Sequence, residues 1–192
     1  MKKIKTLYLL SPFQQLKFFV FIYLITVSGV AFSQSNGNGG GSGYSDAESQ
    51  DIARKYALKI GVSIDSLEFI HIYQVMDKWS EFVTTNPDKI GSNSDAVFAQ
   101  FMYYLAFRTK IPADVGLLYK DRKTYLFRNL IYLRPGDLLF YGKNSSKPDK
   151  LAFYLQNNYV VFPDANGSLQ FQPYKTLEEK FSLTAAKIDR DE

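Results

Sequence analysis

The chain has 192 residues, of which 46% are hydrophobic and 16% aromatic, and this suits one well-buried globular domain. It contains no cysteine and one histidine, which excludes disulfides, a cysteine nucleophile, cysteine-ligated metals and a histidine-rich metal centre, so no metal or cofactor is expected. The formal net charge of +4 comes entirely from four lysines within the first 17 residues. The rest of the chain is neutral and gives no support for nucleic-acid binding.

The first 33 residues have the pattern of an export signal. The four lysines precede the apolar run Phe18–Phe32, and Ala31 and Ser33 provide the small residues of a cleavage site. We therefore expect a signal peptide over residues 1–33, cleaved near Ser33, and a periplasmic or secreted protein. The apolar run is short for a membrane span, so no stable span is expected after the signal is removed. An uncleaved amino-terminal anchor is the alternative.

Residues 34–43 are rich in Gly, Ser and Asn and indicate a flexible tether, which leaves residues 44–192 as one domain. The sequence from Ser45 to Glu48 fits a capping box, and apolar residues then recur at helical spacing up to Gly61.

Two further helices are predicted before the pattern changes. One spans Ser66–Phe82, and Thr84–Ser94 forms a loop after it. The next, Asp95–Phe107, is apolar on nearly all sides, as expected for a helix buried in a core.

The second half of the chain is dominated by short apolar runs. Pro135-Gly136 predicts a turn in which proline presets φ and glycine accepts a positive φ, and Asn157-Asn158 predicts a tight hairpin turn. Helices followed by an antiparallel sheet of about five strands indicate an α+β fold. The expected strands are Leu138–Tyr141, Lys150–Leu155, Tyr159–Phe162, Ser168–Phe171 and Thr184–Ile188.

Several of these segments resemble the NlpC-type cell-wall peptidases, papain-like cysteine endopeptidases that cleave the peptide stems of peptidoglycan. "YLRPGDLLFYG" is close to that family's Pro-Gly-Asp strand, and "DKLAFYLQNNYVVFPDA" resembles its histidine strand and the strand after it. "SDAVFAQFMYY" resembles the catalytic helix, with Phe98 in place of the family's phenylalanine, and "KIP" resembles the following Leu-Pro. The resemblance covers roughly residues 72–188 and implies a papain-like fold with amino-terminal helices packed on the sheet.

The catalytic residues of that family are missing. The resemblance places the nucleophilic cysteine at Asp95, the general-base histidine at Lys150 and the third, ring-orienting residue at Phe162. A carboxylate is a poor nucleophile toward an amide, and a lysine held beside it stays protonated. We therefore expect a pseudoenzyme without catalytic residues. We also expect Asp95 and Lys150 to form an ion pair across the old cleft.

Other polar and aromatic residues have mainly structural interpretations. His71 is expected to be an ordinary histidine on a helix face, and Asp137 to cap the amides of the Pro-Gly turn. Asp164 could pair with Asp95 as two glycosidase carboxylates. Tyr119 and Tyr159, in or next to turns, are candidates for a stacking groove. Lys120–Lys123 is expected to be a solvated loop.

The sequence therefore predicts an exported, inactive NlpC-like module that binds peptidoglycan stem peptides or an envelope protein. The candidate binding residues are Asp95, Lys150, Phe162, Asp164, Tyr119 and Tyr159. Two alternatives stay open: a cell-wall hydrolase with rewired chemistry based on Asp95 or Asp164, and a regulator that docks on active cell-wall hydrolases.

Overall fold

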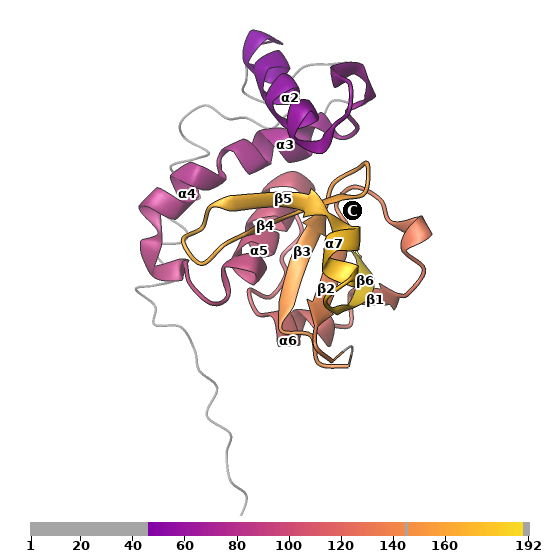
Figure 1. The fold of residues 1–192 in the computed structure, drawn as a ribbon. Coiled ribbons are helices and arrows are strands. Elements are labelled where there is room, and N and C mark those ends of the chain that lie inside the picture. Colours follow the sequence, from indigo (N-terminus) through magenta and orange to yellow (C-terminus); the bar gives the residue numbers. More distant parts are fainter. Residues whose placement is uncertain (1–45, 145, 190–192) are drawn as a thin grey trace, which may run out of the picture. The chain divides into compact units, whose positions relative to one another are not determined.

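Helices occupy the first half of the described chain and strands the second, in a computed structural model that describes residues 46–144 and 146–189 (Figure 1). The predicted signal peptide (1–33), the tether (34–43) and Ser45 of the capping box lie outside these residues. Residues from Ala47 onward form one compact unit. None of the helices among the described residues combines the length and the apolar character that crossing a membrane requires.

The first described helix, α2 (Asp46–Ile60), has the predicted apolar face and is followed by Gly61, whose φ is +68°. The second predicted helix, Ser66–Phe82, is wrong as a single element: it is divided into α3 (Ile70–Asp77) and α4 (Trp79–Thr85). The division falls at Lys78, whose backbone N–H donates to the Val75 carbonyl at 3.1 Å. At the start of α4, the Trp79 indole N–H donates to the Gly167 carbonyl oxygen at 2.7 Å, and the ring packs against buried aromatic side chains.

The third helix, α5 (Ser94–Phe107), lies within one residue of its prediction and is the buried helix of the fold. Two helices of five residues were not predicted, because they are shorter than two turns and carry little periodicity. They are α6 (Val115–Tyr119), capped by the Asp114 carboxylate, and α7 (Tyr174–Glu178).

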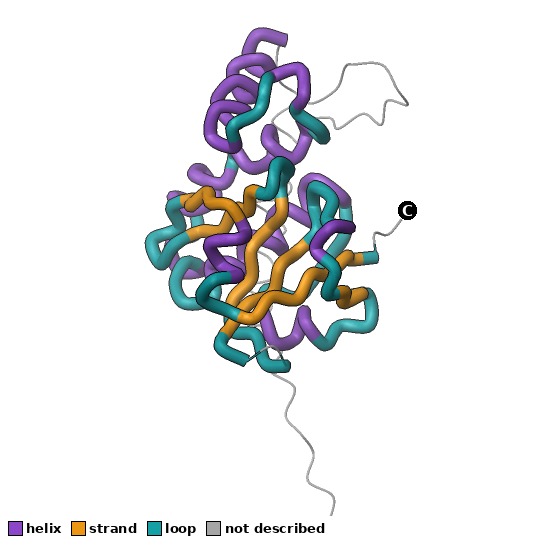
Figure 2. The backbone as a smooth tube through the Cα atoms, turned by 45° about the vertical axis from the view of Figure 1, so that its right-hand side comes forward, coloured by secondary structure: helices purple, strands orange, loops and turns teal. Residues whose placement is uncertain are grey.

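The strands, orange in Figure 2, form one antiparallel sheet. Their order in the sheet is β1-β6-β2-β3-β4-β5. All five predicted strands are present, and the sheet has one strand more than the five expected. The additional strand, at one edge, follows a basic loop and has an exposed centre, so it lacks the apolar alternation that marked the others. The strands are β1 (Thr124–Phe127), β2 (Leu138–Gly142), β3 (Lys150–Tyr154), β4 (Tyr159–Pro163), β5 (Leu169–Pro173) and β6 (Ser182–Ile188).

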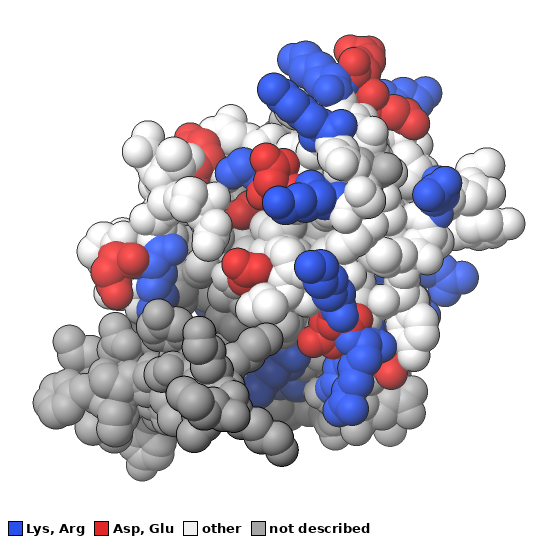
Figure 3. Space-filling view, turned by 90° about the horizontal axis from the view of Figure 1, so that it is seen from below, with Lys and Arg blue, Asp and Glu red and all other residues white. Residues whose placement is uncertain are grey.

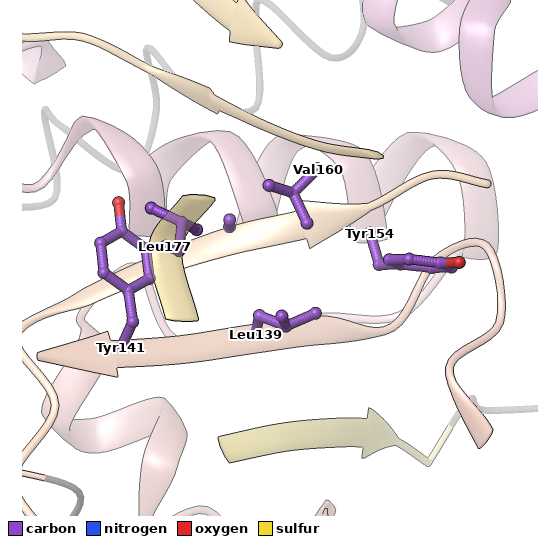
Figure 4. Close-up of a cluster of buried hydrophobic side chains, with 6 residues drawn as sticks. Leu139, Tyr141, Tyr154, Val160 and Leu177 are labelled. Atoms are coloured by element: carbon purple, nitrogen blue, oxygen red, sulfur yellow. The ribbon is translucent and has the colours of Figure 1, made fainter. Parts of the chain in front are cut away.

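The two faces of the sheet are covered by different helices. On one face Phe98 and Tyr103 of α5 meet Phe153 of β3 edge to face, with ring centroids 6.3 and 6.2 Å apart. On the other face lies a cluster in which Leu177 of α7 covers apolar side chains of the central strands (Figure 4). Because side chains alternate along a strand, the central strands are buried on both faces. The strand residues of this cluster are Leu139, Tyr141, Ala152, Tyr154 and Val160.

The two predicted turns form as expected. Gly136 has a φ of +99°, and the Asp137 N–H donates to the Arg134 carbonyl at 2.9 Å, which closes the Pro-Gly turn. The Asp137 carboxylate accepts from the Arg134 N–H at 2.8 Å, so its predicted capping role is confirmed. Asn157 and Asn158 both have positive φ, of 53° and 63°, at the turn between β3 and β4.

Candidate functional site

A pocket of about 210 Å³ opens where α5 and β3 begin, beside the turn between β4 and β5. Four of the six predicted binding residues line it: Asp95, Lys150, Phe162 and Asp164. They come from three separate parts of the sequence, which the antiparallel sheet brings together. Gly91, Ser92, Ser94, Tyr141, Pro163 and Ala165 complete the lining.

Asp95 forms the floor of this pocket from the first turn of α5. Its side chain is buried, and its two carboxylate oxygens accept hydrogen bonds from the backbone N–H groups of Ala96 and Leu151, each at 2.9 Å. The bond to Leu151 joins the start of the buried helix to the start of β3. A carboxylate in the first helical turn is also favoured by the helix dipole. Asp95 therefore has a structural role in holding helix and sheet together.

Burial and hydrogen bonding have opposite effects on the pKa of the Asp95 carboxyl. Burial raises the pKa of the Asp95 carboxyl above its ordinary value. The Leu151 N–H, the Lys150 charge and the Ala96 N–H act in the opposite direction and reduce that pKa shift.

The predicted ion pair between Asp95 and Lys150 is wrong. Ion pairs within 4.0 Å form elsewhere among the described residues, as between Arg54 and Asp51 and between Lys55 and Asp77, but Asp95 and Lys150 are not paired in this way. Lys150 is exposed, and its ammonium donates to the Ser92 carbonyl at 3.2 Å. The lysine therefore influences that carboxylate through its charge and not through contact.

Aromatic side chains form one wall of the pocket. Phe162 of β4 is half-buried. The centroid of its ring lies 6.2 Å from that of Tyr141 of β2. Burial, and then the charges of Asp95 and Asp149, raise the pKa of the Tyr141 phenol, which therefore stays protonated. Phe162 has no hydrogen-bonding group with which to orient a catalytic side chain.

Asp164 lies at the pocket rim, but its oxygens serve the β4–β5 turn. One oxygen accepts from the backbone N–H of Asn166 at 2.9 Å and of Ser168 at 3.0 Å. The other accepts from the Gln170 amide at 3.1 Å. This is the hydrogen bonding of an Asx turn.

Two predicted binding residues are not among the residues that line this pocket. Tyr119 packs edge to face on Phe140 at 5.2 Å and contributes to a separate pocket of about 260 Å³ beside β1. Tyr159 begins β4 and is paired with Pro173 of β5. His71 of α3 packs against the rings of Phe69 and Phe107, at 6.0 and 5.9 Å, as a helix-face histidine does.

Ser94 is a lining residue that the sequence did not indicate. It is buried, and its hydroxyl forms 2.8 Å hydrogen bonds with both the N–H and the carbonyl of Gly91. The contact is local, between residues three apart, and a serine at the start of an apolar helical run is the signal that could have indicated it. The position of Tyr141 could have been inferred, because it opposes Lys150 in the β2–β3 ladder.

A further pocket of about 410 Å³ lies on the α4 side of the same turn between β4 and β5. Trp79 and Phe171 form part of its lining, together with Lys55, Asp77 and Lys59. Lys55 is paired with Asp77, and the Lys59 ammonium lies 4.7 Å from the centroid of the Phe171 ring.

The lining of the pocket at the start of α5 lacks the thiol and the imidazole that a cysteine endopeptidase uses. The chain has no thiol, and its one imidazole, that of His71, does not line the pocket. What the pocket offers is a lysine ammonium at the rim, an aromatic wall and a buried carboxylate whose oxygens are already bonded. Such a set offers a ligand one positive charge and an apolar contact, beside the carboxyl groups of Asp95 and Asp164.

Solved structures of NlpC/p60 proteins are similar to this chain. RipD from Mycobacterium tuberculosis, described as a non-catalytic NlpC/p60 domain protein with an adaptation to peptidoglycan-binding function, is 22% identical with a TM-score of 0.40. That match covers 50% of this chain and 67% of RipD. An NlpC/p60 family protein from Bacillus cereus is 21% identical (TM-score 0.39), with 47% of this chain and 30% of that one covered.

NlpC2 from Trichomonas vaginalis is 14% identical (TM-score 0.42), and the match covers 60% of this chain and 46% of that one. The chain thus spans less than half of the Bacillus and Trichomonas proteins. No protein-family model matches the sequence, and no curated protein does. The solved structures belong to the same family that the sequence motifs resemble.

Proposed function

We propose that this protein is an exported, catalytically inactive NlpC-like module that binds peptidoglycan stem peptides at the pocket where α5 begins. The observation that carries the proposal is the hydrogen bonding of the buried Asp95 carboxylate. At the position where the resemblance places a nucleophile, the chain has a buried carboxylate whose two oxygens accept backbone N–H groups of α5 and β3. A side chain that joins helix to sheet in this way serves the scaffold and leaves the pocket available for binding.

The size and polarity of the pocket suit part of a peptide. Its volume of about 210 Å³ is below the roughly 300–1,000 Å³ of sites that enclose a small molecule, so it has room for one side chain or a chain end of a longer ligand. Stem peptides carry free carboxylates, which would meet the exposed Lys150 ammonium. An apolar part of the same residue would contact Phe162. RipD is described with the same combination of lost catalysis and peptidoglycan binding.

The hydrogen bonding of the two acidic side chains disfavours a rewired hydrolase. Both carboxylates have structural roles: Asp95 joins α5 to β3, and Asp164 holds the β4–β5 turn. A regulator that docks on active hydrolases would not need this pocket, and it is distinguished from the proposed function by the experiment below.

The test is co-sedimentation of the protein with purified peptidoglycan, with Lys150→Gln and Phe162→Ala as pocket variants. Lys180→Gln is the matched control, since Lys180 is also exposed and is not among the lining residues. We expect the pocket variants to pellet less than the wild type and the control to pellet like it. Equal pelleting of all variants, or no pelleting of the wild type, would contradict the proposal.

A further inference from the structure

The segment around β1 carries a net positive charge, whereas the rest of the chain after residue 33 does not. Residues 120–134 contain five basic side chains and one acidic one, whereas the chain after residue 33 is neutral as a whole. The acidic one, Asp121, is half-buried, and its carboxylate accepts from the Lys123 backbone N–H at 2.8 Å. The exposed basic residues of this segment are Lys120, Arg122, Arg128 and Arg134.

Large apolar side chains project from the same segment. Ile131 is 83% exposed and Tyr132 68% exposed, and Tyr125 and Leu126 of β1 are 59% and 42% exposed. These are four of the nine large hydrophobic side chains that are exposed among the described residues. We call them, with Arg122, Arg128 and Arg134, the β1 edge surface. Figure 3 shows blue and uncharged side chains at the right-hand edge of the molecule, the side on which β1 lies in Figure 1.

The local structure holds the two most exposed side chains outward. Residues Leu130–Tyr132 form a single 3-10 turn, capped by the Asn129 side chain, which accepts from the Ile131 N–H at 3.2 Å. Leu133, just after the turn, packs against the apolar cluster beneath α7. The turn is therefore anchored on one side while Ile131 and Tyr132 point away from the core.

Protection of a sheet edge explains only part of this surface. β1 pairs with β6 alone, and charged residues beside an edge strand prevent pairing with other chains. That role accounts for Arg122 and Arg128 and not for an isoleucine and a tyrosine exposed outside the strand. Basic side chains interleaved with exposed aliphatic and tyrosine side chains are the combination that binds the interface of an anionic membrane.

We propose that the β1 edge surface docks on an anionic lipid surface, with Ile131 and Tyr132 entering the headgroup region and Arg122, Arg128 and Arg134 contacting lipid phosphates. This association is peripheral and uses none of the residues that line the pocket at the start of α5. The domain would thereby be held against a membrane while that pocket stays accessible. The docking stands independently of the proposed peptidoglycan binding.

The test is co-flotation of the chain from Gln34 onward with vesicles of phosphatidylcholine, with and without phosphatidylglycerol. This form includes the whole compact unit and omits the apolar run 18–32, which would bind lipid by itself. We expect binding only to vesicles with phosphatidylglycerol, and its loss at high salt. Removing both charges in Arg128→Gln/Arg134→Gln should weaken binding by about an order of magnitude or more.

Ile131→Ser/Tyr132→Ser should also weaken binding, and Leu58→Ser, at another exposed apolar side chain (77% exposed, on α2), should leave it unchanged. Absence of binding to anionic vesicles, or equal loss in the Leu58 control, would overturn the proposal. Retention on poly-glutamate without vesicle binding would also overturn it, and would indicate an acidic protein as the partner of this surface.

Discussion

Asp95 shows how a single residue can keep a position and change its role. Its carboxylate is buried, yet it is bonded to two backbone amides and not to a positively charged side chain. Buried polar groups are stabilising when every partner is satisfied and costly when one is removed. Asp95 is therefore a structural carboxylate held by backbone amides, and not one held by an ion pair.

The first prediction compares the two residues that were expected to pair. Asp95→Ala leaves the buried Leu151 N–H without an acceptor and should lower the free energy of unfolding by about 1–3 kcal/mol. Lys150→Ala removes an exposed ammonium and should cost no more than about 1 kcal/mol. Denaturant unfolding measures both values. Similar losses in the two variants would indicate an ion pair after all.

The second prediction concerns pH. Because burial raises the pKa of Asp95 in the folded state, its contribution to stability is fully present below the unfolded pKa of about 3.9 and is lost as pH rises through the folded pKa. The free energy of unfolding of the wild type, relative to Asp95→Asn, should therefore fall as pH rises above the unfolded pKa of about 3.9. Unfolding curves of both proteins over this range test the sign, and a relative gain for the wild type at higher pH would contradict it.

At the scale of elements, the turn before β2 positions the strand that forms one wall of the pocket. Gly136 occupies the second central position of that turn with a positive φ, its N–H donates to the Tyr154 carbonyl, and its carbonyl accepts from the Tyr103 hydroxyl of α5. The turn thus joins β2 to β3 and the sheet to the buried helix.

The third prediction uses two glycines in contrasting conformations. Gly136→Ala forces a side chain into a positive φ and should destabilise the fold by about 1–3 kcal/mol. Gly116 lies within α6, where alanine is favoured over glycine by about 1 kcal/mol, so Gly116→Ala should be neutral or stabilising. Thermal unfolding of both variants provides the measurement. A destabilisation shared by both would show that the backbone conformation at Gly136 is not the cause.

Elements with strong local signals were predictable, and those fixed by distant contacts were not. Adjacent residues determine three of these elements, and the structure contains all three. They are the helix over the apolar run Asp95–Phe107, the Pro-Gly turn and the Asn-Asn turn. The indole of Trp79, just after the break between α3 and α4, donates to Gly167, an acceptor 88 residues away that no local pattern contains. The exposed strand β1 likewise has no apolar alternation, and its partner β6 comes at the end of the described chain.

At the scale of the whole molecule, topology explains which site residues could be predicted. The resemblance to a known family placed Asp95, Lys150 and Phe162 near one another, and all three line one pocket. What could not be inferred was the bonding between them, because the contact of Asp95 with the Leu151 amide depends on the exact approach of α5 to β3. Tyr119 and Tyr159 were selected for their places in turns, a property that does not determine which pocket they line.

The most direct test of the central claim is to incubate the chain from Gln34 onward with purified peptidoglycan and to analyse both the pellet and the released fragments by mass spectrometry. A binding module without catalytic groups predicts protein in the pellet and no released muropeptides, for the wild type and for Asp95→Asn alike. Muropeptides released by the wild type and not by Asp95→Asn would contradict this account and would identify Asp95 as a catalytic carboxylate.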